Sequence, residues 1–377
     1  MAEQMNTFAF ELYAELRAGA STLFFSPFSI FAAFAMTSVG ARGATHEQLA
    51  AVLHTPPVRE NFPEGEAGGC NISPLLLPAA DMDKDGFALH VANRIWGQAG
   101  HSFLENFLSE LKTRYQAELK TLDFERDCES ARIAINDWTA EATNGLVKDL
   151  IPPGVIKPLT RLVLTNAIYF KGLWENEFDA ALTEKALFYS HPGSAGQETD
   201  MMRGEMEIRH GATDSVQAIE LPYKGGRLSM VVLLPPLGAL DSFEQSLDSG
   251  RLESILNTMS LQKVSVHLPK WTMDWTVELS EAMKSLGAAD AFDPDAADFS
   301  GMDGSRNLYI TAALHKAYVE VNEQGTEAAA ATAVIVGFRS IPSEPLLFNA
   351  DHPFLYLIRD RQNGAILFMG RLAEPTQ

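Results

Sequence analysis

The first third of the chain carries hydrophobic residues at helical spacing. Phe8, Leu12 and Leu16 recur every four residues and predict an amphipathic helix near the start. Ser26 followed by Pro27 is typical of an N-cap with proline at the first helical position. The apolar stretch around them contains serine, threonine and proline, so we predict a buried helix rather than a membrane span. Further helices are predicted from about Thr45, over 102–118 and over 128–142, with strands over 87–96 and 119–124.

From residue 162 onward the pattern is one of strands. Residues 162–170 form a nearly continuous apolar run, typical of a strand that is buried on both faces. Further strands are predicted over 199–209, 216–222, 228–234, 263–269, 313–323, 353–359 and 365–372, and helices near 240–256 and 276–286. A helical N-terminal part followed by mixed sheets indicates an α+β fold. We predict one domain over residues 1–377, with residues 55–86 as a long surface loop.

The amino-acid composition and the N-terminal sequence limit the kinds of binding partner and the cellular compartments to be considered. The formal net charge of −20 argues against nucleic-acid and anionic-membrane partners, because these select basic surfaces. The two cysteines, Cys70 and Cys128, lack the spacing of a metal site; we expect free thiols, although one disulfide would also fit. No signal peptide precedes the first predicted helix, which leaves open a cytoplasmic protein and a secreted one that has been trimmed.

The chain shows none of the common catalytic motifs. It has no GxSxG, HExxH, GxGxxG or P-loop sequence. Its histidines and serines could form a triad only through the fold, and nothing in the sequence indicates one. Asp81, Asp83 and Asp85 alternate as in a calcium loop, but the distal glutamate is missing and a solvated acidic loop explains them better. We therefore predict no enzyme, no metal site and no cofactor.

The segment from Glu323 to Ser340 is the most unusual in the chain. Its four consecutive alanines favour a helix by intrinsic propensity. The flanks favour strands, because residues 317–321 alternate and residues 334–336 are β-branched. Two interpretations stay open on this segment alone: an exposed alanine-rich helix or linker, and a strand that has not joined its sheet.

Motifs spread over nearly the whole chain resemble the serpin family of serine protease inhibitors. Their number and order, more than any single motif, carry the resemblance. They are FFSPFSI at 24–30, ANRIW at 92–96, NDW at 136–138, TNG at 143–145, LIPPG at 150–154, TNAIYFKGLW at 165–174, ADHPFL at 350–355 and FMGRL at 368–372.

The resemblance implies a fold and a mechanism. The fold is a mostly helical N-terminal part, a large mixed five-stranded central sheet, two smaller sheets and an exposed reactive-centre loop, here at about 325–343. The mechanism is suicide inhibition of a protease, in which the cut loop inserts into the central sheet as a sixth strand. The reactive bond would be Arg339–Ser340, and Arg339 would suit trypsin-like enzymes. Phe338 before it would favour kallikrein-like ones.

The hinge residues fit such an insertion. They are Gly325, Thr326, Glu327, Ala328, Ala329, Ala330 and Ala331. Gly325 can change its backbone angles at little cost. Thr326, Ala328, Ala330 and Thr332 fall on one face at the strand period of two, and all are small and uncharged. The 14 residues from Thr326 to Arg339 would span roughly 46 Å as a strand, enough to carry a bound protease from one pole of the molecule to the other.

The resemblance also implies two groups of control residues. Ser26, Ser29, Asn166 and His315 match a polar cluster beneath the central strands that governs sheet opening. The alternative for His315 is a buried core histidine whose hydrogen bonds are all made. A role in the cluster is compatible with this alternative. Trp174 matches the aromatic residue where the loop first inserts. Lys270 and Glu323 match a pair that ties the base of the loop to a neighbouring strand.

A non-inhibitory serpin-like carrier or chaperone is the alternative function. The small, uncharged inward-facing hinge positions favour the inhibitor. Heparin activation in the family uses a basic helix in the region that here covers 57–86, which holds only Arg59 and Lys84 among many acids. We therefore expect no heparin cofactor. The partner predicted is a trypsin-like serine protease in a covalent complex with a monomeric inhibitor.

Overall fold

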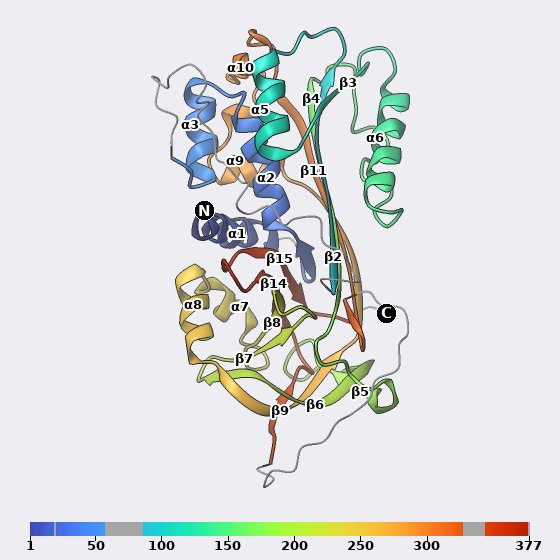
Figure 1. Cartoon of the computed structure of the whole chain (residues 1–377), viewed down its shortest axis with the longest axis vertical. Coiled ribbons are helices and arrows are strands. Elements are labelled where there is room, and N and C mark those ends of the chain that lie inside the picture. The colour runs from blue at the N-terminus through green and yellow to red at the C-terminus, as the bar shows by residue number, and fades with distance from the viewer. Residues whose placement is uncertain (19, 57–85, 327–343, 376–377) are drawn as a thin grey trace.

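The computed structural model describes residues 1–18, 20–56, 86–326 and 344–375, and shows two sheets with most of the helices gathered around one end of the molecule (Figure 1). The N-terminal helices are α1 (Ala2–Arg17), α2 (Pro27–Ser38), α3 (Gly43–Val52), α5 (Glu105–Tyr115) and α6 (Cys128–Ala142). The later ones are short: η1 (Ala180–Leu182), α7 (Leu240–Gln245), α8 (Ser249–Thr258), α9 (Ser280–Ser285), η2 (Asp290–Phe292) and α10 (Ser300–Asp303). Among the described residues, no helix has the length and apolar character needed to cross a membrane.

The main sheet runs along the long axis of the molecule. Its order is β10 (Trp271–Glu278), β11 (Ile310–Asn322), β12 (Gly325–Thr326), β4 (Leu162–Leu173), β2 (Phe87–Gln98) and β3 (Leu119–Leu122). β12 contributes two residues at one end, and elsewhere β11 pairs directly with β4 in parallel. Besides β12 the main sheet thus has five strands, as predicted, with β3 and β10 covering opposite ends of it. Helix α6 lies over one face, and α1 and α2 lie on the other side (Figure 1).

The second sheet has nine strands. Its order is β1 (Leu23–Phe25), β15 (Ile366–Leu372), β14 (Phe354–Asp360), β8 (Leu228–Leu234), β7 (Val216–Pro222), β6 (Gln197–Thr213), β9 (Ser260–Pro269) and β13 (Leu346–Asn349), with β5 (Glu184–Phe188) beside β6. Two smaller sheets were expected here. The 17-residue β6 pairs with β7 over one part and with β5 and β9 over another, so hydrogen bonds join them into one path. The α+β fold class is confirmed.

Helix α2 is buried along its whole length, as predicted. The Ser26 side chain accepts a hydrogen bond from the Ser29 N–H at 3.1 Å, and Pro27 takes the first helical position. α1, β15, β2 and β4 all pack against it. Because water reaches no side of this helix, apolar residues occupy almost all of its positions rather than one stripe.

The predicted helix near 276–286 is wrong in its first part. β10 continues to Glu278, and α9 begins only at Ser280. Residues 271–278 pair with β11 along their whole length, from Trp271 opposite Val321 to Glu278 opposite Leu314. Hydrogen bonds to a strand about 40 residues away therefore decide the structure of this segment, and the local pattern does not.

Two other helix boundaries differ from prediction. The helix expected over 240–256 is two helices, because Asp248 caps α8 by accepting a hydrogen bond from the Arg251 N–H at 2.7 Å. The helix expected from Thr45 begins at Gly43 instead. The hydroxyl oxygen of Thr45 accepts a hydrogen bond from the Asp298 N–H at 2.9 Å, so this residue serves a tertiary contact.

Candidate functional site

The main sheet admits an extra strand at one end only. After β11 the chain turns back, and Thr326 pairs with Val321 of β11 on one side and with Gly172 of β4 on the other. Further along, β11 and β4 pair with each other, from Tyr318 opposite Tyr169 onward. The sheet therefore holds the first two residues of a sixth strand and is closed beyond them.

Gly325 is needed at this position because the backbones approach closely. A Cβ atom there would overlap the carbonyl oxygen of Gly172 and lie 2.8 Å from the Cα of Leu173. Thr326 next to it is fully buried. The two described residues of the predicted hinge thus lie inside the main sheet.

Trp174 lies directly beside this opening, as expected. Its backbone N–H donates to the carbonyl oxygen of Gln324 at 2.9 Å, and its indole N–H donates to that of Asn322 at 3.0 Å. Its ring stacks on Tyr223 with centroids 4.6 Å apart. Trp174 thereby holds the turn that feeds β12.

Lys270 and Glu323 form the expected pair at the base of the loop. The Lys270 Nζ lies 2.9 Å from Glu323 Oε2, and the Thr183 hydroxyl donates to Glu323 Oε1 at 2.8 Å. Burial raises the pKa of the Glu323 carboxyl, but these hydrogen bonds outweigh it and the net pKa is lowered. Glu323 therefore stays ionised and connects the turn to Lys270, between β9 and β10, and to Thr183 at the end of η1.

The sheet-opening cluster is also brought together. Asn166 on β4 stands opposite His315 on β11, and its amide donates to the Ser29 hydroxyl at 2.7 Å. Ser29 donates in turn to Asn93 Oδ1 at 2.9 Å. Ser26 meets the same cluster through its backbone N–H, which donates to His315 Nε2 at 3.1 Å.

Asn93 belongs to this cluster although the sequence did not single it out. It lies on β2 opposite Asn166, so that Asn93, Asn166 and His315 form one row across three strands. The Asn166 amide donates to Asn93 Oδ1 at 2.6 Å. A signal was present in the sequence, since Asn93 is a polar residue within a strand motif, but only the register shows what it faces.

The hydrogen bonds of His315 determine its tautomer. Nε2 accepts from the Ser26 N–H, so the ring proton lies on Nδ1 and is donated to Asn166 Oδ1. Burial lowers the pKa of His315 to about 3, because the charged form would be desolvated. The neutral ring therefore links α2 to β4 and β11 across the closed sheet.

This histidine predicts a pH dependence. Its pKa is lower in the folded protein than the value of about 6.5 in an unfolded chain, so the unfolded state binds more protons between these values. Stability is then full above about pH 6.5 and is lost as the pH falls toward 3. Between pH 7.5 and 5 we expect the parent to lose about 2 kcal/mol more than His315→Gln, at a slope of at most about 1.4 kcal/mol per pH unit. Urea denaturation at both pH values measures this.

The exposed His191 offers the control for this measurement. His191→Gln should keep the pH dependence of the parent. Carboxylates titrate in all three proteins and cancel from the difference. Equal losses in the parent and in His315→Gln would contradict the assignment of His315 as a buried neutral link.

The other predicted site residues lie outside the described residues. They are Glu327, Ala328, Ala329, Ala330, Ala331, Phe338, Arg339 and Ser340. Cys70 lies outside them too, whereas Cys128 is a free thiol in the described part.

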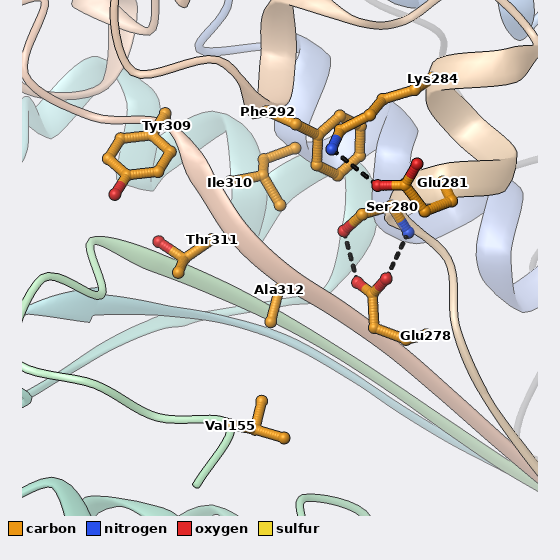
Figure 2. Close-up of a pocket in the computed structure, with 10 residues that line it drawn as sticks. All are labelled: Val155, Glu278, Ser280, Glu281, Lys284, Phe292, Tyr309, Ile310, Thr311 and Ala312. Atoms are coloured by element: carbon orange, nitrogen blue, oxygen red, sulfur yellow. Dashed lines mark hydrogen bonds and ion pairs between the residues drawn. The ribbon is translucent and has the colours of Figure 1, made fainter.

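A pocket of about 270 Å³ lies at the opposite end of β11 (Figure 2). Its charged groups already have partners: Lys284 pairs with Glu281 at 2.9 Å, and the Glu278 carboxylate accepts hydrogen bonds from the hydroxyl and the N–H of Ser280. Ile310 and Ala312 of β11 form part of its apolar wall. The pocket shares no residue with the opening at β12, and we do not include it in the site.

Comparisons with known proteins agree with this geometry. The serpin (serine protease inhibitor) family model matches residues 3–375. The chain is 40% identical to an uncharacterized serpin-like protein of Thermococcus kodakarensis, covering 98% of this chain and 85% of that one. It is 37% identical to the leukocyte elastase inhibitor of Xenopus tropicalis, covering 98% and 97%. The structure of human thyroxine-binding globulin in a ligand complex matches with a TM-score of 0.85 at 27% identity, covering 100% and 98%.

Proposed function

The chain belongs to the serpin family, and we propose that it is a suicide inhibitor of trypsin-like serine proteases that is cleaved after Arg339. It would act as a monomer of one domain, without heparin or another cofactor. The leukocyte elastase inhibitor among its relatives supports protease inhibition. The choice of target rests on the residues of this chain alone.

The observation that carries the proposal is β12. Gly325 and Thr326 already occupy the gap between β4 and β11 and pair with both. The gap is filled from the end where the loop begins, so a freed loop can continue the same strand. The inserted loop would then pair with β4 on one side and with β11 on the other, in place of the direct pairing between these two strands.

The register of β12 predicts which residues of β4 and β11 each loop residue would lie between after insertion. Six residues beyond Thr326, Thr332 would lie opposite His315 on one side and Asn166 on the other. Insertion would therefore separate these two residues and place a small hydroxyl between them. Ten residues beyond Thr326, Val336 would lie opposite Leu162, where β4 begins. The strand thus fills the sheet just before the predicted reactive bond.

The mechanism follows from this geometry. The protease attacks the carbonyl carbon of Arg339 and forms an acyl-enzyme, and the amino group of Ser340 leaves. The loop then inserts and carries the attached protease along the main sheet. Deacylation stalls because a distorted oxyanion hole and triad lose the alignment that hydrolysis requires. This chain supplies the bait and the stored conformational energy, and the protease supplies the catalytic groups.

Arg339 is the expected specificity residue. Its guanidinium would pair with the carboxylate in the specificity pocket of a trypsin-like enzyme. Phe338 before it would favour enzymes with room for a bulky neighbour, such as kallikrein-like proteases. The strongly acidic chain would also attract a cationic protease, although solubility alone explains the charge.

Incubation with an equimolar amount of trypsin tests the proposal. On a denaturing gel we expect a band of higher mass that survives boiling, and we expect Arg339→Ala to lose it. Arg126→Ala is the control, because Arg126 is 86% exposed and lies at the turn before α6. Cleavage without the complex would show a substrate, and the carrier or chaperone alternative, to which the likeness to thyroxine-binding globulin lends support, would replace inhibition.

A further inference from the structure

Tyr223, just after β7 of the second sheet, contacts Thr326, the second residue of β12. It is fully buried, and its ring stacks on Trp174, with centroids 4.6 Å apart, and meets Phe170 edge to face, with centroids 5.0 Å apart. Its backbone N–H donates to the carbonyl oxygen of Leu228 at 3.0 Å. The ring therefore has little freedom to turn, and its hydroxyl has a fixed position.

That hydroxyl contacts the hinge directly. The Tyr223 oxygen lies 2.8 Å from the Thr326 hydroxyl oxygen, and both side chains are fully buried. Burial raises the pKa of Tyr223, so the phenol stays protonated and able to donate. This buried hydroxyl pair is costly to separate, because the Tyr223 hydroxyl would stay buried without a partner when Thr326 leaves the sheet.

β12 depends on such a contact more than a longer strand would. It consists of two residues, and strands of this length are marginal without added support. Gly325 offers no side chain, so Thr326 is the first hinge residue that can be held by one. The hydrogen bond between Tyr223 and Thr326 therefore stabilises the first row of the sixth strand while the rest of the sheet is closed.

We propose that Tyr223 is a positioning residue for inhibition, which holds Thr326 in the main sheet so that loop insertion starts from a formed first row. The proposal rests on the inhibitory function above and adds a residue that governs its outcome. After acylation, insertion competes with hydrolysis of the acyl-enzyme. A hinge that has left the sheet must be ordered again before insertion can start. This delay slows insertion, so a larger share of the acyl-enzyme is hydrolysed and the protease is released.

Tyr223→Phe tests this, because it removes the hydroxyl and keeps the stacked ring. With trypsin we expect the ratio of released, cleaved inhibitor to covalent complex to rise about fivefold, the factor that corresponds to a hydrogen bond of about 1 kcal/mol. The rate of the first cleavage should stay unchanged, since the proposed role of Tyr223 acts through Thr326 after the acyl-enzyme has formed. A general loss of stability would not raise the ratio of cleaved inhibitor to complex while leaving the rate of the first cleavage unchanged.

Tyr356→Phe is the matched control. Tyr356 is also fully buried in an aromatic cluster, but it lies on β14 and packs on Trp271 with centroids 5.1 Å apart. Its hydroxyl has no hydrogen bond to the hinge among the described residues. The control should keep the partition ratio of the parent, and a rise equal to that of Tyr223→Phe would overturn the proposal.

The partner side of the bond gives an independent test. Thr326→Val should raise the ratio as Tyr223→Phe does, whereas Thr326→Ser, which keeps the hydroxyl, should not. The double variant Tyr223→Phe/Thr326→Val should show less than the product of the two single effects, because both remove the same bond. Fully multiplicative effects would contradict a direct link, and so would a fall in the ratio in Tyr223→Phe.

Hydrogen exchange without protease separates this proposal from the inhibitory function. The amides of Gly325 and Thr326 should exchange faster in Tyr223→Phe than in the parent and in Tyr356→Phe. If the parent traps no protease but the exchange differs as expected, the inhibitory function fails and the contact stands. If the parent traps protease and neither exchange nor partition changes, the role of Tyr223 is refuted.

Discussion

Replacing Thr326 with arginine should convert the inhibitor into a substrate. Thr326 is fully buried between β4 and β11, with its hydroxyl against Tyr223. A guanidinium there would lose its water and find no counter-charge, at a cost of at least about 3 kcal/mol. Insertion past this row would slow accordingly, and the acyl-enzyme would hydrolyse first. We expect the covalent complex to fall by more than about 100-fold while cleavage continues.

The measurement is a titration of trypsin with each variant, with complex and cleaved inhibitor quantified on denaturing gels. Glu327→Arg is the matched control, because the strand alternation assigns this neighbouring position to the solvent face. It should trap protease nearly as well as the parent. Equal trapping by Thr326→Arg would mean that Thr326 does not enter the sheet during inhibition, and the proposed mechanism would be wrong.

Cleavage of the loop should make the protein markedly more stable. By the register of β12, insertion adds about ten residues to the main sheet, from the row after Thr326 to the row of Leu162. Backbone hydrogen bonds to both neighbours, at about 1 kcal/mol each, would contribute roughly 10 kcal/mol or more. The melting temperature should then rise by about 13 °C or more, since unfolding 377 residues carries an entropy of about 0.8 kcal/mol/K. The intact form is expected to persist because the barrier to insertion is high.

Circular dichroism melting of the intact and the cut protein measures this rise. A cut in the loop by a metalloprotease, which forms no acyl-enzyme, gives the inserted form without the complex. Cut Thr326→Arg is the control and should melt close to the intact protein, because its strand is blocked at the first row. An unchanged melting temperature in the cut parent would exclude insertion and favour the carrier or chaperone alternative.

Much of the fold could be predicted locally. The run over residues 162–170 is a strand buried on both faces, and β7 and β8 have the bounds that alternation and apolar runs indicate. Ser26 and Pro27 cap α2 as their residue types require. Such signals succeed because burial on both faces, alternation and capping each depend on residues close in the chain. β10 was missed because its partner strand lies about 40 residues away.

The candidate site divides in the same way. The hinge could be predicted from the sequence, because strand insertion requires small, uncharged residues at alternate positions and the chain has them after a glycine. The row of Asn93, Asn166 and His315 and the contact of Tyr223 with Thr326 could not, because they join residues more than 70 positions apart. Register and packing place these groups within hydrogen-bonding distance, and only the tertiary structure determines both.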